Sequence, residues 1–140
     1  MLEVTQVTSD NELVQIHSLN GANLRIVLSN EQQQQLGFVT WLYSISLLKQ
    51  LHSTAPSIIV KNQEKVVGYA LTALIKAGSF HTDLREMIMN LETINFKGKP
   101  LSSYNIILWA RFVLIKIIAA KVYSVCCFKS IKSYIVKNMS

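Results

Sequence analysis

Apolar and polar residues alternate at the start of the chain and then repeat with helical spacing. Leu2 to Val7 alternates closely enough to predict a short first strand. A helix capped by Asp10 is expected to run to Asn20, with three apolar residues on one face: Leu13, Ile16 and Leu19. Asn20-Gly21 is typical of a helix stop or turn, so we expect the first helix to end there.

One segment left open between helix and loop, and then a second helix, are expected before the middle of the chain. Leu24 to Leu36 contains the run Gln32 to Gln35, which is interpreted as the polar face of a helix or as a surface loop. The stretch GFVTWLYSISLLKQL follows, and its apolar residues form a helical stripe: Tyr43, Ile45, Leu47, Leu48 and Leu51. This helix is expected to end near His52, because Ser53 to Pro56 breaks the pattern.

The clearest local signal is an antiparallel hairpin. Ser57–Lys61 is a short β-branched strand, the polar residues after it predict a tight turn, and Lys65–Ile75 is a longer apolar strand. Gly68 inside the second strand allows a bulge or a close approach of the backbone. We therefore expect these two segments to pair.

A helix and a loop are predicted after the hairpin. The helix starts at Thr82-Asp83, with four apolar residues expected to face inward: Leu84, Met87, Ile88 and Leu91. NFKGKPLSSY, which contains Gly98 and Pro100, is predicted to be a loop. The order strand, helix, helix, strand, strand, helix indicates an α/β or α+β fold, with a mostly antiparallel sheet flanked by helices.

The last quarter of the chain differs from the rest in charge. Residues 105–140 hold six of the 14 basic residues and none of the 8 acidic ones, so they carry the whole net charge of +6. The first 104 residues are neutral. We interpret residues 1–104 as part of one domain and residues 105–140, here called the tail, as a separate basic and apolar segment.

Targeting signals and metal-binding patterns are not found in the sequence. The first residues, MLEVTQVTSDNELV, lack the basic and apolar regions of a secretory signal, so a cytoplasmic protein is expected. Cys126 and Cys127 are adjacent and predict no disulfide framework. The histidines have no spacing typical of zinc ligands, and they are candidates for proton transfer only in principle: His17, His52 and His81.

Four segments follow one another along the first 104 residues, and their order and spacing carry a family resemblance: GFVTW, the hairpin IIVKNQEKVVGYAL, the helix HTDLREMIMNL and the loop GKPLSSY. Together they resemble the N-terminal half of the GNAT superfamily of N-acetyltransferases, over about Asn11 to Tyr104. The strongest piece is VVGYAL in the second strand of the hairpin. The resemblance implies a mixed sheet that opens as a V around acetyl-CoA. It also implies transfer of an acetyl group to the primary amine of a small molecule or peptide.

The resemblance further implies where the acceptor would bind. Phe38, Trp41 and Tyr43 lie where the first two helices of the family border the acceptor substrate. The alternative is that these aromatic side chains belong to the core, which their spacing also permits. The reaction needs a base that deprotonates the acceptor ammonium, and no residue is assigned to that role.

The cofactor turn of the family is missing. In GNAT proteins a turn of the pattern Arg/Gln-x-x-Gly-x-Gly/Ala opens a helix, and its backbone N–H groups hold the pyrophosphate of acetyl-CoA. Glycine is needed there because a side chain would block the approach of the cofactor. Gly98 is the last glycine of this chain. No cofactor-binding residue is therefore identified, the domain is expected to be incomplete, and this polypeptide is expected to be inactive.

Translation of the tail out of frame accounts for the missing turn. In the shifted frame, each new codon combines the third base of one codon with the first two bases of the next. Read in this way, the codons of Ile118 to Val122 permit Arg-Gly-Lys-Gly, and the codons of Trp109 and Ala110 must encode glycine. The shifted frame permits DYRGKGVF, which resembles the family at the cofactor turn and supplies the Arg-x-x-Gly part of its pattern. The tail is therefore interpreted as a frameshift product. One face of the hairpin is then expected to be poorly covered at four positions: Val66, Val67, Tyr69 and Leu71.

A native tail is the alternative, and it predicts a non-enzymatic protein that binds a membrane surface or a partner. Charges interrupt every apolar run, so a spanning helix is not favoured. An interfacial helix is favoured over it, with lysines toward phosphates and apolar residues buried: Lys121, Lys129, Lys132, Ile117, Ile118 and Tyr123. Nucleic-acid binding is not expected, because basic residues near Phe112 and Tyr123 are not an RNA-binding motif. The tail is predicted to be mainly helical, with an improvised strand as the alternative for Ile106, Leu108 and Phe112.

Overall fold

The computed structural model describes residues 1–74, 82–103 and 107–114, which form an α+β fold with an antiparallel sheet. The order of elements begins β1 (Leu2–Gln6), α1 (Asp10–Ala22), α2 (Asn30–Leu36), α3 (Ile45–Thr54), β2 (Ile58–Asn62) and β3 (Lys65–Leu74). It continues α4 (Thr82–Glu92), β4 (Asn95–Phe96), β5 (Lys99–Pro100), the 3₁₀ helix η2 (Leu101–Ser103) and β6 (Ile107–Leu114). The predicted first strand, hairpin and helices are confirmed, and Asn30–Leu36, which the sequence left open between a helix and a surface loop, is a helix.

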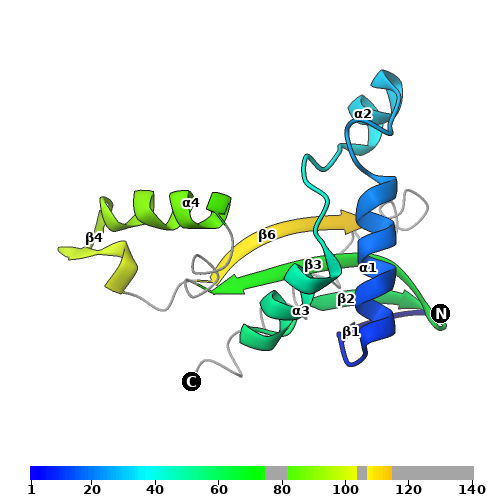
Figure 1. The fold of residues 1–140 in the computed structure, drawn as a ribbon, viewed down its shortest axis with the longest axis horizontal. Coiled ribbons are helices and arrows are strands. Elements are labelled where there is room, and N and C mark those ends of the chain that lie inside the picture. The colour runs from blue at the N-terminus through cyan, green and yellow to red at the C-terminus, as the bar shows by residue number, and fades with distance from the viewer. Residues whose placement is uncertain (75–81, 104–106, 115–140) are drawn as a thin grey trace.

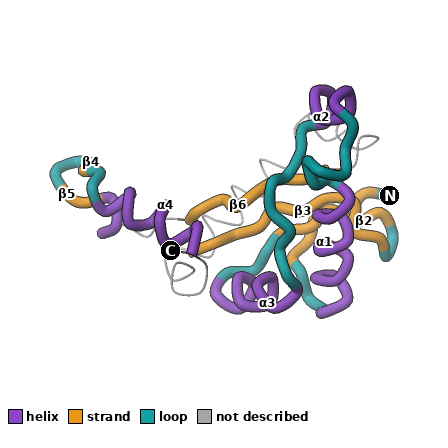
Figure 2. The backbone as a smooth tube through the Cα atoms, turned by 45° about the horizontal axis from the view of Figure 1, so that its top comes forward, coloured by secondary structure: helices purple, strands orange, loops and turns teal. Residues whose placement is uncertain are grey.

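Four strands form one antiparallel sheet in the order β1-β2-β3-β6 (Figures 1 and 2). The predicted hairpin is β2 and β3, and Ile75 lies outside the described residues. The register shifts where Val60 lies opposite Gly68 and Lys61 lies opposite Val66, so a bulge occurs beside Gly68. Because β6 pairs along the other side of β3, β3 lies inside the sheet and β1 forms one edge.

The described part of the tail is a strand. Ile107–Leu114 pairs with β3 from Gly68 to Leu74, so the prediction of a helical tail is wrong for these residues. Its apolar run is compatible with either structure, but pairing with the free side of β3 supplies partners for the backbone groups of both strands. Leu108 and Phe112 therefore lie in a strand, which was the alternative to a helix that the sequence left open for these residues. Ile106 and residues 115–140, which include the predicted interfacial helix, lie outside the described residues.

The hairpin is covered on both faces. Val66, Val67, Tyr69 and Leu71 each expose at most 5% of their surface, so the prediction of a poorly covered face is wrong. Helices α1 and α3 pack against β3, and β6 pairs along its side. The core cluster joins these helices, the sheet and the segment before α3: Val7, Leu13, Ile16, Val39, Tyr43, Leu48, Ile59, Val66, Tyr69 and Leu71.

Helix α1 begins and ends differently from its prediction. Ser9, and not Asp10, is the N-cap: its Oγ accepts from the Glu12 N–H at 3.3 Å, and the Glu12 carboxylate accepts from the Ser9 N–H at 3.1 Å. This reciprocal pair is a capping box. The predicted stop at Asn20-Gly21 is also wrong, because the helix continues to Ala22. Hydrogen bonds of the buried Asn20 side chain, described below, hold it in the helix.

The next two helices follow their predictions more closely. The glutamine run Gln32–Gln35 lies in α2, whose N-cap Ser29 forms a second capping box with Gln32. Helix α3 follows its N-cap Ser44 and buries Leu48 and Leu51. Tyr43, which was assigned to the helical stripe, lies just before this helix.

The residues from α4 to η2, 82–103, form an arm that extends beside the sheet (Figures 1 and 2). Helix α4 begins at Thr82 as predicted. Ile88 is 7% exposed and Leu91 is partly buried, in agreement with their predicted inward orientation. The side chains of Leu84 and Met87 lie outside the described set.

The predicted loop after α4 contains a small hairpin instead. Strands β4 and β5 pair antiparallel, with Phe96 opposite Lys99. Lys97 and Gly98 between them have φ of 50° and 78°. A two-residue connection with positive φ at both positions matches the twist of an antiparallel pair, and Gly98 adopts it without steric strain. The loop prediction failed because it took Gly98 and Pro100 as breakers of strand structure.

Candidate functional site

An extended segment, residues 37–44, joins α2 to α3 and lies against the end of α1. It begins at Gly37, the C-cap residue of α2, whose φ of 72° is a conformation that glycine adopts readily. The Val39 N–H donates to the Asn23 carbonyl, and the Val39 carbonyl accepts from the Arg25 N–H, both at 2.9 Å. The Val39 side chain is buried in the core cluster. The segment is therefore attached to the residues that follow α1 by backbone bonds as well as by packing.

Two side chains of α1 hold the backbone of Tyr43. Asn20 Oδ1 accepts from the Tyr43 N–H at 3.0 Å, and His17 Nδ1 lies 2.7 Å from the Tyr43 carbonyl oxygen. Because a carbonyl oxygen only accepts, Nδ1 carries the proton in this contact, and Nε2 is the unprotonated nitrogen of the neutral His17 ring. Asn20 Nδ2 also donates to the Tyr69 hydroxyl at 2.9 Å. One fully buried side chain thus joins α1, the segment and β3.

The roles of His17 and Asn20 are not predicted by the sequence pattern. Asn20 was interpreted as part of a stop signal because Asn-Gly is common in turns. A signal was nevertheless present, since Asn20 lies on the same face of the helix as Leu13 and Ile16. A polar residue on a core-facing stripe must find hydrogen-bond partners there. The identity of those partners, Tyr43 and Tyr69, is a matter of tertiary structure.

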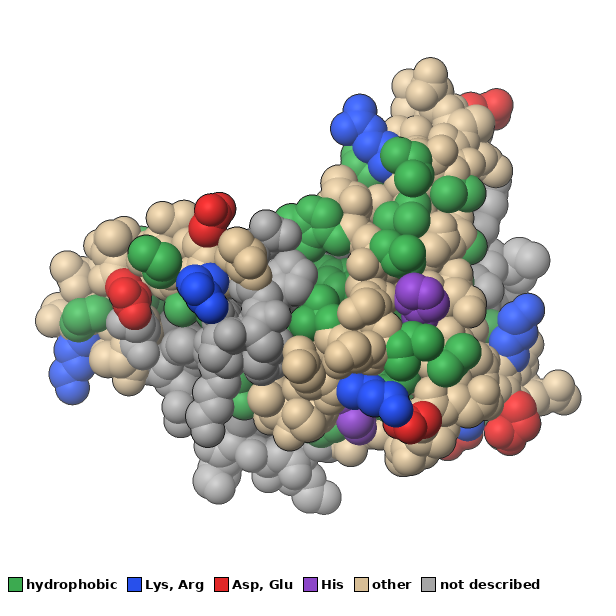
Figure 3. All heavy atoms as spheres, in the orientation of Figure 1, with side chains coloured by type: hydrophobic (Ala, Val, Ile, Leu, Met, Phe, Trp, Pro, Cys, Tyr) green, Lys and Arg blue, Asp and Glu red, His purple; other side chains and the backbone are tan. Residues whose placement is uncertain are grey.

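Five apolar side chains near this segment form what we call the aromatic surface: Ile26, Val27, Phe38, Trp41 and Leu42. Phe38 and Trp41 are 39% and 42% exposed, and Ile26 reaches 90%. Figure 3 shows hydrophobic side chains gathered on this face, along α1 and the segment that follows α2. The Arg25 guanidinium lies 5.2 Å from the centre of the Phe38 ring, within the range of a cation–π contact. This surface can accept an apolar group beside a single cation.

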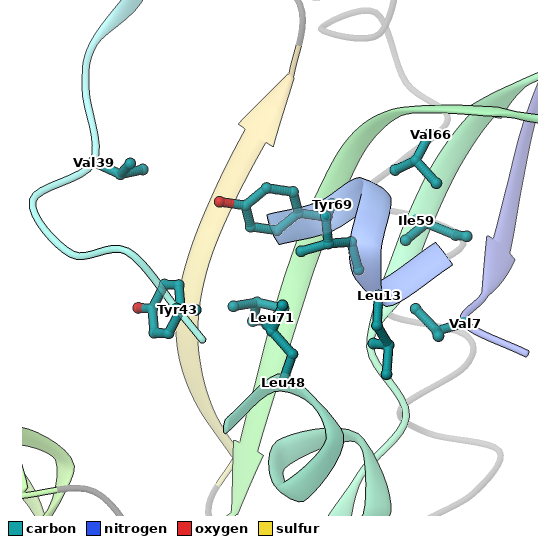
Figure 4. Close-up of a cluster of buried hydrophobic side chains, with 10 residues drawn as sticks. Val7, Leu13, Val39, Tyr43, Leu48, Ile59, Val66, Tyr69 and Leu71 are labelled. Carbon is teal, nitrogen blue, oxygen red and sulfur yellow. The ribbon is translucent and has the colours of Figure 1, made fainter. Parts of the chain in front are cut away.

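The three aromatic residues predicted to border the acceptor lie in two environments. Tyr43 is 3% exposed and packs in the same cluster as Tyr69 and Leu71 (Figure 4). Its position agrees with the core interpretation. Phe38 and Trp41 are the two that a molecule at the surface can reach.

A charged pair anchors the start of α1 to the sheet. The Glu12 carboxylate accepts from the Thr8 N–H at 2.7 Å, the Ser9 N–H at 3.1 Å and the Lys61 ammonium at 3.0 Å. Burial by itself raises the pKa of the Glu12 carboxyl, but these three bonds outweigh it and lower the pKa from 4.5 to about 2. The bond to Glu12 is the main cause that raises the pKa of Lys61. Both groups are therefore charged over the neutral pH range.

We expect Glu12→Gln to reduce the free energy of unfolding at pH 7 by roughly 2 kcal/mol. A carboxyl whose pKa is lower in the folded state stabilises the fold above its unfolded pKa, and this stability is lost as pH falls through the folded pKa. The difference between the parent and Glu12→Gln should therefore shrink between pH 4.5 and about 2. Urea unfolding at several pH values measures it. Glu86→Gln, at an exposed position of α4, should change the free energy of unfolding at pH 7 by less than about 0.5 kcal/mol.

The other histidines add little to the site. His52 Nδ1 accepts from the Ser57 N–H at 3.4 Å, which orders the turn between α3 and β2. His81 lies outside the described residues. The Ser57 hydroxyl is buried, and no hydrogen-bond partner for it occurs in the described part of the chain.

Metal and membrane signals are not found in the parts of the chain that the structure covers. Residues 1–74, 82–103 and 107–114 contain no group of three or more His, Cys, Asp or Glu side chains that could hold a metal ion. No helix within these ranges has both the length and the apolar character needed to cross a membrane. The positions that would encode the cofactor turn in the shifted frame lie in residues 115–140, outside the description.

Comparison with known proteins returns no relative: no protein-family model matches the chain, and no curated protein or solved structure is significantly similar to it.

Proposed function

We propose that residues 1–104 are the N-terminal half of a GNAT N-acetyltransferase domain and that the tail is the product of a frameshift. The observation that carries this proposal is the arrangement of the sheet. Helices α1 to α3 are inserted between β1 and its neighbour β2, and β2 then pairs antiparallel with β3. This order agrees with the first half of the domain that the sequence resembles.

The reaction class follows from the family resemblance. A neutral amine attacks the carbonyl carbon of the acetyl thioester, a C–N bond forms, the C–S bond breaks, and the sulfur of coenzyme A leaves and is protonated. The acceptor ammonium must first lose a proton to a base or to water. Phe38 and Trp41 are proposed to contact the acceptor, because they are the exposed aromatic residues of the segment assigned to the acceptor side. The Arg25 guanidinium beside Phe38 suits an acceptor with an apolar group better than a polyamine.

The polypeptide as written is expected not to bind acetyl-CoA more tightly than roughly 1 mM. Its last glycine is Gly98, at the tip of the β4–β5 hairpin, so no glycine follows at the place of the family's cofactor turn to bring backbone N–H groups close to a pyrophosphate. Isothermal titration calorimetry with acetyl-CoA, and with coenzyme A as a second ligand, measures this. Micromolar binding to the parent chain would show that its cofactor site is intact and would contradict the frameshift.

A second candidate function is a non-enzymatic protein whose basic, apolar tail binds a membrane surface or a partner. The charge of the tail supports it, since residues 105–140 hold six basic residues and no acid. The pairing of Ile107–Leu114 with β3 counts against it, because that part of the tail is engaged in the sheet. Helix formation by the tail that depends on added lipid would favour this candidate.

A further inference from the structure

The arm, residues 82–103, is an insertion that the sheet itself does not require. It lies between β3 and β6, which are antiparallel neighbours of the kind that a short turn can join. The main contacts of its described elements are with one another: α4 packs on η2, and β4 pairs with β5. In both views the β4–β5 end lies far from α1 and α2 (Figures 1 and 2). None of its described residues belongs to the core cluster.

The far end of the arm combines apolar and cationic side chains. Ile94 and Phe96 are 48% and 52% exposed, and both lysines of the hairpin are exposed. The Lys97 ammonium lies 5.5 Å from the centre of the Phe96 ring. Residues 93–103 contain Lys97 and Lys99 and no acid, whereas the acids of the arm lie on α4: Asp83, Glu86 and Glu92. Positive charge is therefore concentrated where the arm is most distant from the core.

Local bonds order this end. The Leu101 N–H donates to the Ile94 carbonyl at 2.7 Å, and the Ser103 hydroxyl donates to the Pro100 carbonyl at 2.7 Å. The turn at Lys97 and Gly98 closes the hairpin between them. The apolar and cationic groups are thus presented together by a short folded unit.

We propose that the tip of the arm, defined as Ile94, Phe96, Lys97 and Lys99, docks this protein on an anionic lipid surface. Exposed aromatic and aliphatic side chains enter the boundary between headgroups and acyl chains, and lysine ammonium groups contact lipid phosphates and carboxylates at the same depth. A nucleic acid is a poorer match, because single-strand binding uses several aromatic rings for stacking, and the tip has one. The site depends neither on acetyl transfer nor on residues 105–140.

Co-sedimentation of the full chain with vesicles tests this proposal. The vesicles contain phosphatidylcholine alone or with roughly 30% phosphatidylserine, and we expect binding only to the second kind. Because each lysine near such a surface adds about 1 kcal/mol of attraction, Lys97→Glu/Lys99→Glu should reduce the partition coefficient roughly tenfold or more. Phe96→Ser should reduce it as well, and Phe96→Trp should preserve it. Raising the salt from about 0.1 M to about 0.5 M should weaken binding.

Matched variants separate the tip from the general charge of the chain. Lys49→Glu/Lys65→Glu makes the same change in net charge at exposed positions of the body and should bind as the parent does. Lys97→Asn/Lys99→Gln removes both charges of the tip. Asparagine tolerates the positive φ of residue 97, so the hairpin should remain intact while vesicle binding weakens. The proposal is overturned if either tip variant binds vesicles like the parent, or if the Lys49/Lys65 variant loses as much vesicle binding as the tip variants. It is also overturned if a single-stranded oligonucleotide binds through the tip and the vesicles do not.

Discussion

Correcting the reading frame after Tyr104 should convert a chain that does not bind acetyl-CoA into one that does. In the shifted frame the tail permits DYRGKGVF, which supplies two glycines at the point where the family binds the cofactor pyrophosphate. Backbone N–H groups at the start of a helix then face the phosphates, aided by the helix dipole. We expect the dissociation constant to fall from above roughly 1 mM to about 10 μM or lower, a gain of at least about a hundredfold.

The single-base correction also changes the charge and the apolar character of the tail, so the corrected chain should be more soluble. The experiment inserts or deletes the one base, expresses both chains, and compares their solubility and their acetyl-CoA binding by calorimetry. A corrected chain in which both glycines of the new turn are changed to valine is the matched control. It should fold but lose the cofactor. An early stop codon in the corrected frame, or a product that neither folds better nor binds acetyl-CoA, would mean that the tail is native.

Replacing Asn20 with leucine should destabilise the fold by about 2–4 kcal/mol. The side chain is fully buried and makes two bonds, to the Tyr43 N–H at 3.0 Å and to the Tyr69 hydroxyl at 2.9 Å. Leucine fills a similar volume but removes both bonds, so two buried polar groups lose this partner. The segment from Gly37 to Ser44 should also detach more easily from α1, because the Asn20 bond to the Tyr43 N–H is lost and the His17 contact with the Tyr43 carbonyl remains.

Urea unfolding at pH 7 measures the loss, and hydrogen exchange at the Tyr43 amide reports on the segment. Tyr69→Phe removes one of the two bonds and should cost about 1 kcal/mol, and the double variant should show coupling between the two positions. Ser18→Ala is the matched control, since Ser18 lies on the exposed side of the same helix and bonds only to the Val14 carbonyl in the described contacts. It should change stability by less than about 0.5 kcal/mol. A loss below about 1 kcal/mol for Asn20→Leu would contradict a structural role for this network.

Several elements follow from local pattern. The β2–β3 hairpin was predicted because β-branched and apolar residues flank a short polar turn, and the structure pairs those segments. Helix α4 was predicted from its start at Thr82 and its apolar spacing. Both depend on neighbours in sequence, so the information needed to predict them lies within a short window.

The acceptor-side residues were predictable only in part. The aromatic positions Phe38, Trp41 and Tyr43 are visible in the sequence, but their spacing does not say which of them faces the solvent. Backbone bonds join Val39 to Asn23 and Arg25, and side chains of His17 and Asn20 contact the backbone of Tyr43. Together they place Tyr43 in the core and leave Phe38 and Trp41 at the surface.

By itself, the sequence determined an α+β order in which only α2 was left open between helix and loop, the central hairpin and the contrast in charge between residues 1–104 and the tail. Only the tertiary structure decided that Ile107–Leu114 is a strand, that α1 continues through Asn20-Gly21, and that the β4–β5 hairpin lies at the end of an arm. The physical reason is the same in the first two cases. An apolar run and an Asn-Gly pair are each compatible with more than one backbone conformation, and hydrogen bonds to residues distant in sequence select between them. For β6 the partner is the free side of β3, and for Asn20 the partners are Tyr43 and Tyr69.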